Sequence, residues 1–162
     1  MATANDERQS GGTQAAPIGG EPSAKTFPLS EGEVLALRKH AEWHMLFATG
    51  ERLRWYDAEK CGGSPDETRA EATERMMAAA EVYGACRNAE TAFRDGLKPA
   101  AEAAKVEFTD KALIWMGTQR SEIRNGLESA RGTVEVNIDS TPTETFLLFV
   151  LDGVCEGASD RG

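Results

Sequence analysis

Mostly apolar side chains recur at alternating steps of four and three residues in the middle of the chain. The residues at these positions are Ala72, Met76, Ala79, Tyr83, Cys86, Glu90, Phe93 and Leu97. This spacing places them on one face of an α-helix, as in the seam of a coiled coil. Ser64, Pro65 and Glu67 supply an N-cap, a first-turn proline and a capping-box acid, and Gly96 ends the pattern. The spacing therefore predicts a helix from about residue 65 to 95 whose seam faces another helix.

The preceding segment predicts a second long helix, which is apolar on two sides. Ser30 and Glu33 form a capping box, so the helix is expected to begin near Glu31 and to run to about Lys60. One apolar stripe consists of Val34, Leu37, Ala41, Met45, Ala48 and Trp55. The other, roughly opposite at about 100° per residue, consists of Leu35, Trp43, Leu46, Phe47 and Leu53. The first stripe is expected to face the neighbouring helix in an antiparallel hairpin.

The remaining sequence predicts one more long helix, a strand and a short terminal helix. Thr109 can cap a helix that ends at Gly132. Residues 133–139 alternate between apolar and polar side chains, as a half-buried strand does. Its partner could be residues 105–108, the same strand of another subunit, or residues 146–151. A cap, a proline and an acid precede residues 146–151, which slightly favours a short helix there over a hairpin strand.

Together these elements predict a mainly α protein. The expected architecture is an antiparallel helical hairpin plus a third helix, forming a three- to four-helix bundle with a small β element near the C-terminus. Residues 29–155 are expected to form a single domain. Residues 1–28 hold few bulky apolar side chains and are expected to be a disordered tail. Residues 156–162 are expected to fray.

Charge and composition exclude several classes of partner. The chain has 162 residues and a formal net charge of -9, with a sequence pI near 4.8. This charge disfavours binding to nucleic acid or to an anionic membrane. The longest apolar run is too short to span a bilayer. Three widely spaced cysteines indicate neither a disulfide framework nor a zinc site, and no secretory signal is visible, so we expect a cytoplasmic protein.

Residues with catalytic or ligand-binding chemistry are few. No nucleotide-binding or nucleophile-elbow motif occurs, and we expect neither a cofactor nor catalytic residues. His40 and His44, one helical turn apart, are weak candidates for two metal ligands, but a metal site would need further ligands from elsewhere. Cys86 lies on the apolar seam and is expected to be a buried small hydrophobe.

Two charged residues interrupt the predicted helical seams. Glu90 lies on one seam and Arg120 on that of the third helix. If these helices pack together, the two side chains could form an ion pair that fixes their register. Alternatively, each side chain reaches solvent at the end of the bundle.

The apolar face of the first helix is the best candidate for a functional surface. Residues Leu35, Trp43, Leu46, Phe47 and Leu53 must be covered by the third helix, by residues 146–154, or by another protein or a second copy. We therefore expect a non-enzymatic interaction module, such as an adaptor, a regulator or an assembly component. Alternatives are a metal-binding helical bundle that uses His40 and His44, and an acidic inhibitor or decoy.

Overall fold

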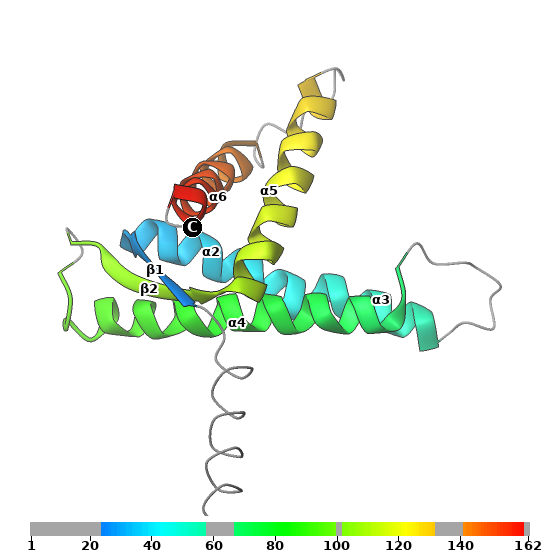
Figure 1. Cartoon of the computed structure of the whole chain (residues 1–162), viewed down its shortest axis with the longest axis horizontal. Helices are drawn as coiled ribbons and strands as arrows, with labels where there is room; N and C mark the ends of the chain where they lie inside the picture. Colours follow the sequence, from blue (N-terminus) through cyan, green and yellow to red (C-terminus); the bar gives the residue numbers. More distant parts are fainter. Residues whose placement is uncertain (1–23, 58–66, 100–101, 132–140, 161–162) are drawn as a thin grey trace, which may run out of the picture.

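The computed structural model describes residues 24–57, 67–99, 102–131 and 141–160. In chain order its elements are β1 (Ala24–Leu29), α2 (Glu31–Trp43), the π-helical turn η1 (His44–Ala48), α3 (Thr49–Asp57), α4 (Arg69–Arg94), β2 (Ala104–Thr109), α5 (Asp110–Arg131) and α6 (Thr141–Asp160). The protein is therefore mainly α, as the sequence predicts. Figure 1 shows α2 and α3 end to end beside the antiparallel α4, with α5 rising from α4 and α6 lying beside α5.

The expected hairpin between the two longest helical segments is present. Val34, Leu37 and Ala41 of α2 are fully buried against the core, and so are Ala79 and Cys86 of α4. Small side chains on α4 let the two backbones approach closely. The α4 seam ends at Phe93, because Gly96 adopts a left-handed φ of 72° and turns the chain, which leaves Leu97 80% exposed.

The predicted start of the second helix of the hairpin is wrong. The structure begins α4 at Arg69, where Thr68 and Glu71 form a complete capping box. Glu67 lies before the helix and forms an ion pair with Arg52 at 2.8 Å. Two capping-box patterns follow each other in the sequence, and in the structure the Glu67 side chain pairs with Arg52 and Arg75. Ser64 and Pro65 lie outside the described residues.

The predicted β element near the C-terminus is also wrong. The described residues contain a two-stranded antiparallel sheet on the N-terminal side, in which β1 pairs with β2 and Phe27 lies opposite Val106. The alternation within residues 105–108 is therefore used, but its partner is a segment of the expected tail. The candidate strand 133–139 lies outside the described residues.

Regular structure extends beyond both expected domain boundaries. Strand β1 begins at Ala24, before the expected start at Leu29, and α6 continues past Cys155 to Asp160. The two ends meet: Lys25 Nζ donates to the Ala158 carbonyl at 3.1 Å. A Cβ atom on Gly157 would lie 3.3 Å from the Phe27 ring, so this residue lets α6 approach β1 closely.

Helices α5 and α6 complete the core above α2. Thr109 Oγ1 accepts a hydrogen bond from the Ala112 amide at 3.2 Å, as expected of a helix cap. Met116 and Gln119 of α5 are buried. Leu147, Val150, Leu151 and Val154 of α6 face the same core. The preference for a helix over a hairpin strand at residues 146–151 is confirmed.

Candidate interaction surface

The helical rod opposite α4 is interrupted by a π-helical turn. In η1 the Thr49 amide donates to the His44 carbonyl, which is one residue farther back than in an α-helix. Such a turn holds one extra residue, so it rotates all later positions backwards by about 100°. The pattern of buried positions along the rod therefore changes at η1.

This rotation corrects the two apolar stripes predicted for the first helix. Trp55 was expected to be buried but is 52% exposed, whereas the adjacent Tyr56 is only 8% exposed. Leu53 was expected on the outer stripe, but it is half-buried. One extra residue before α3 explains both differences, because it moves each later core-facing position one residue farther along the sequence.

The rotation aligns an exposed row of residues on the side of the rod opposite its core-facing residues. This row, which we call the outer row, consists of five residues spaced four apart: Lys39, Trp43, Phe47, Glu51 and Trp55. In a regular α-helix, a row with this spacing would wind around the axis by about 40° per step. The extra residue in η1 cancels much of that winding, which explains why all five side chains are exposed.

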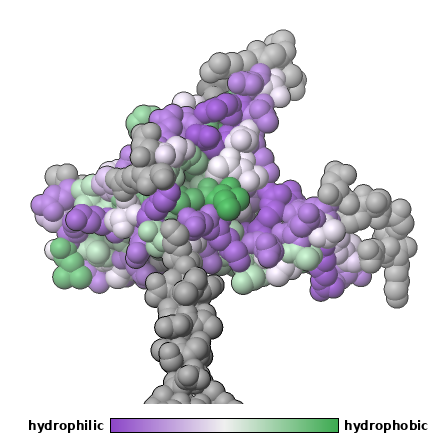
Figure 2. Space-filling view, viewed as in Figure 1, coloured by the Kyte–Doolittle hydropathy of each residue, from purple (hydrophilic) through white to green (hydrophobic). Residues whose placement is uncertain are grey.

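Three of the predicted partner-binding residues are strongly exposed. Trp43 is 55%, Leu46 is 52% and Phe47 is 58% exposed, whereas Leu35 and Leu53 are only half-buried. The third helix and residues 146–154 were possible covers for this face. Among the described residues they pack elsewhere: Trp115 of α5 contacts the His40 and His44 rings, and α6 covers the N-terminal part of α2. Figure 2 shows hydrophobic surface near the centre of that view, where α5 meets the rod, with hydrophilic side chains around it.

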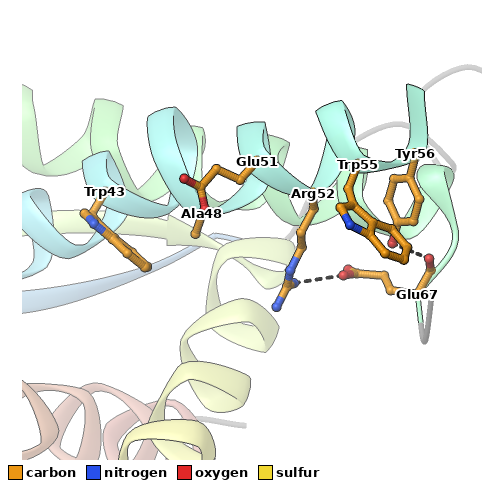
Figure 3. A pocket seen from close by; sticks show the side chains of 7 residues that line it. All are labelled: Trp43, Ala48, Glu51, Arg52, Trp55, Tyr56 and Glu67. Atoms are coloured by element: carbon orange, nitrogen blue, oxygen red, sulfur yellow. Dashed lines mark hydrogen bonds and ion pairs between the residues drawn. The ribbon is translucent and has the colours of Figure 1, made fainter. Parts of the chain in front are cut away.

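A groove of about 530 Å³ runs along the rod beside the outer row. Figure 3 shows Trp43 at one end and Trp55 with Tyr56 at the other. Its remaining lining residues are Ala48, Glu51, Arg52 and Glu67. Arg52 pairs with Glu67, and Tyr56 donates to the Glu67 carbonyl, so the segment before α4 forms one wall of this groove.

The two histidines lie on the flank of the rod that faces α5. Their ring centroids are 4.5 Å apart, and the His40 and His44 rings lie 5.8 and 5.6 Å from Trp115. His40 Nε2 donates to Gln119 Oε1 at 2.8 Å. Burial lowers the pKa of both histidines, and for His44 the charges of His40, Arg75 and Arg52 help lower the pKa to about 4. Both rings are therefore neutral near pH 7.

A metal site at His40 and His44 gains no support from the described residues. Nowhere in ranges 24–57, 67–99, 102–131 and 141–160 do three His, Cys, Asp or Glu side chains gather as metal ligands would. One nitrogen of His40 is already used in the bond to Gln119. The rings pack against Trp115, and the charged groups that act on them are Arg52 and Arg75 on His44 and Glu122 on His40.

The structure does not bring Glu90 and Arg120 together. Glu90 accepts a hydrogen bond from Arg38 Nε at 2.8 Å, which ties α4 to α2. Arg120 instead lies 3.8 Å from Asp152 of α6. The chosen residues do carry interhelical ion pairs, but with other partners, because α4 faces α2 at this level and α5 faces α6.

Cys86 is fully buried, as expected. Burial raises the pKa of its thiol to about 12, with the Glu90 carboxylate adding to the rise. A thiol of this kind stays protonated near neutral pH and has the properties of a small apolar side chain.

Comparisons with known proteins leave the family of this chain open. No protein-family model matches the chain, and neither curated proteins nor solved structures gave a match. Within the described ranges, every helix is too short or too polar to cross a bilayer.

Proposed function

We propose that this chain is a non-enzymatic interaction module that binds protein through the exposed face of the α2–η1–α3 rod. One observation carries the proposal: Trp43, Leu46 and Phe47 are each more than half exposed and adjacent on one face. Large apolar side chains gathered in this way are unusual on an isolated soluble protein, and aromatic anchors dominate the binding energy of protein interfaces.

The surroundings of these residues also suit a docking surface. The inner side of the rod packs in the same buried core as α4, so its outer face is already formed in the isolated chain. The exposed Lys39 and Glu51 lie one helical turn before Trp43 and one turn after Phe47, as charged residues do in the polar rim of an interface. Roles as an adaptor, a regulator or an assembly component would all use such a surface. A cytoplasmic location and the absence of a nucleic-acid partner stay predictions.

Substitution of Leu46 tests the proposal. Leu46→Asp should abolish association of the chain with itself or with proteins captured from its native host, because it places a charge in the centre of an apolar interface. The matched control is Leu97→Asp, since Leu97 is 80% exposed beyond the end of α4, away from the rod face. Sedimentation velocity measures self-association. Capture experiments with the original protein, Leu46→Asp and Leu97→Asp as baits compare the other proteins that each one binds.

The far-UV circular dichroism of both variants should match that of the original protein. If Leu46→Asp loses helicity, Phe47→Ser provides a milder change on the same face. The proposal is wrong if the Leu46 and Phe47 variants self-associate and capture other proteins to the same extent as the original protein and Leu97→Asp.

A further inference from the structure

We infer that, given the interaction module proposed above, the occupant of the outer row is a second copy of this chain packed antiparallel across a two-fold axis. The axis would pass between Trp43 and Phe47. The inference rests on the order of charges and aromatic rings along the row and on which of these charges are satisfied within the chain.

The outer row is complementary to itself when it is reversed. Read along the rod, it runs Lys39, Trp43, Phe47, Glu51: a cation, two aromatic rings and an anion, all spaced by four residues. An antiparallel copy places Lys39 opposite the partner's Glu51 and Trp43 opposite the partner's Phe47. A two-fold axis repeats both contacts, as in an isologous interface.

The same register continues one step farther in both directions. Leu35 precedes Lys39 by four residues and is half-buried, and Trp55 follows Glu51 by four residues and is 52% exposed. The antiparallel register sets Leu35 opposite the partner's Trp55. The row is therefore apolar at both ends and in the centre, and each charge has a partner of opposite sign.

A parallel arrangement would lack this complementarity. It would place Lys39 beside the partner's Lys39 and Glu51 beside the partner's Glu51, and like charges that face each other in an interface repel. The order of charges therefore selects the antiparallel arrangement.

The two charges of the outer row are also available for a contact with a partner. Arg38 pairs with Glu42 and Glu90, and Arg52 pairs with Glu67. Lys39 and Glu51, in contrast, form no ion pair with any residue that the structure describes. Glu31 and Arg54 of the rod also lack an ion pair among the described residues, so the position of Lys39 and Glu51 on the outer row, together with their free charges, suits them to a contact with a second copy.

The alignment of the row depends on η1. Without the extra residue, Glu51 and Trp55 would be rotated by about 100° relative to Lys39 and Trp43. A straight self-complementary row would then not exist. The inference thus assigns a role to a π-helical turn, which is an uncommon feature that often marks functional sites.

Charge exchange on the full chain tests this register. Lys39→Glu and Glu51→Lys each replace two attractive pairs by two repulsive pairs in a homodimer, so each variant should weaken dimerisation by roughly tenfold or more. An equimolar mixture of the two variants should dimerise like the original protein, because every pair across that heterodimer is again opposite in sign. The double variant should likewise recover dimerisation. Sedimentation velocity over a concentration series gives the dimer constants.

Several results would overturn the inference. An original protein that stays monomeric up to about 100 µM would do so, as would single variants that dimerise normally or a mixture that does not recover. Failure here can be told apart from failure of the proposed function. If the chain is monomeric but captures a different protein through Leu46, the homodimer is wrong and the interaction module stands. If the chain is monomeric and no capture depends on Leu46, both proposals are wrong.

Discussion

At the scale of single residues, burial decides the chemistry of the titratable groups. From the sequence, His40 and His44 are only weak candidates for metal ligands, and the structure packs their rings against Trp115 and lowers the pKa of both. Their spacing could be read from the sequence. Their surroundings could not, because Trp115 comes from a helix distant in the chain and reaches them only after α5 docks on the rod.

The low pKa of His44 predicts a loss of stability in mild acid. In the unfolded chain a histidine has a pKa of about 6.5, whereas in the folded protein that of His44 is about 4. The unfolded state therefore binds more protons below pH about 6.5, so the free energy of unfolding should fall as the pH is lowered from there to about 4. Above that window the group should contribute no pH dependence.

Urea unfolding at a series of pH values measures this effect. His44→Gln should show a shallower fall in the free energy of unfolding than the original protein over the same window. Carboxylates titrate in both proteins, so the difference between the two curves isolates the histidine. Parallel curves would show that protonation of His44 is not penalised in the folded state.

At the scale of elements, the ends and faces of helices are set by competing local signals and by ion pairs between elements. The capping boxes at Ser30 and Thr68 both form, and the first is where the sequence predicts it. The register between α2 and α4 involves Arg38 and Glu90, not the predicted pair of Glu90 and Arg120. A seam pattern identifies which residues face inward, but it does not say which helix they face.

A double-mutant cycle should distinguish the observed ion pair from the predicted one. Arg38→Met and Glu90→Gln should be coupled by about 0.5–1 kcal/mol, because the pair is half-buried and directly hydrogen-bonded. Arg120→Met combined with Glu90→Gln should be additive. Thermal or urea unfolding provides the free energies, and equal coupling in both cycles would contradict the assignment.

The π-helical turn should tolerate the loss of one residue. Deletion of Leu46 would convert η1 into an α-helical turn and leave Thr49 and Tyr56 facing the core, since the turn holds one residue more than an α-helix needs. Deletion of the exposed Asn88 is the control. It would rotate the end of α4 by about 100° and turn Phe93 away from the core.

Thermal unfolding followed by circular dichroism compares the two deletions. The protein without Leu46 should keep a cooperative transition, and the protein without Asn88 should lose it or unfold at a much lower temperature. Equal damage by both deletions would mean that η1 is not an insertion within a regular helix.

At the scale of the whole molecule, the first and last elements that the structure describes, β1 and α6, pack together. Strand β1 lies in a segment whose composition is typical of a tail, but Phe27 is 3% and Leu29 is 5% exposed. They pack in the same core as α6, and β1 pairs with a strand from the middle of the chain. The sheet is thus a contact between residues far apart in sequence, and neither strand has a partner nearby in the sequence that could reveal it.

Removal of one buried ring should show that β1 belongs to the folded core. Phe27→Ala should lower the free energy of unfolding by about 3–5 kcal/mol. Phe149→Ala, which removes a ring that is 66% exposed on α6, should cost less than about 1 kcal/mol. Urea unfolding measures both. A small effect of Phe27→Ala would place β1 outside the cooperative unit.

The sequence by itself determined the features that depend on neighbouring residues: the helical class, the helix caps at Ser30 and Thr109, and the seam of α4 as far as Phe93. It identified Trp43, Leu46 and Phe47 as one apolar face but left open whether that face is buried. These follow from periodicity and capping, which act within a few residues. Only the tertiary structure decided the partner of β2, the ion pairs between helices and the rotation at η1. The first two depend on contacts between segments that are distant in the sequence. The extra residue in η1 changes which side chains of α3 face the core, but no feature of the amino-acid composition near η1 marks it.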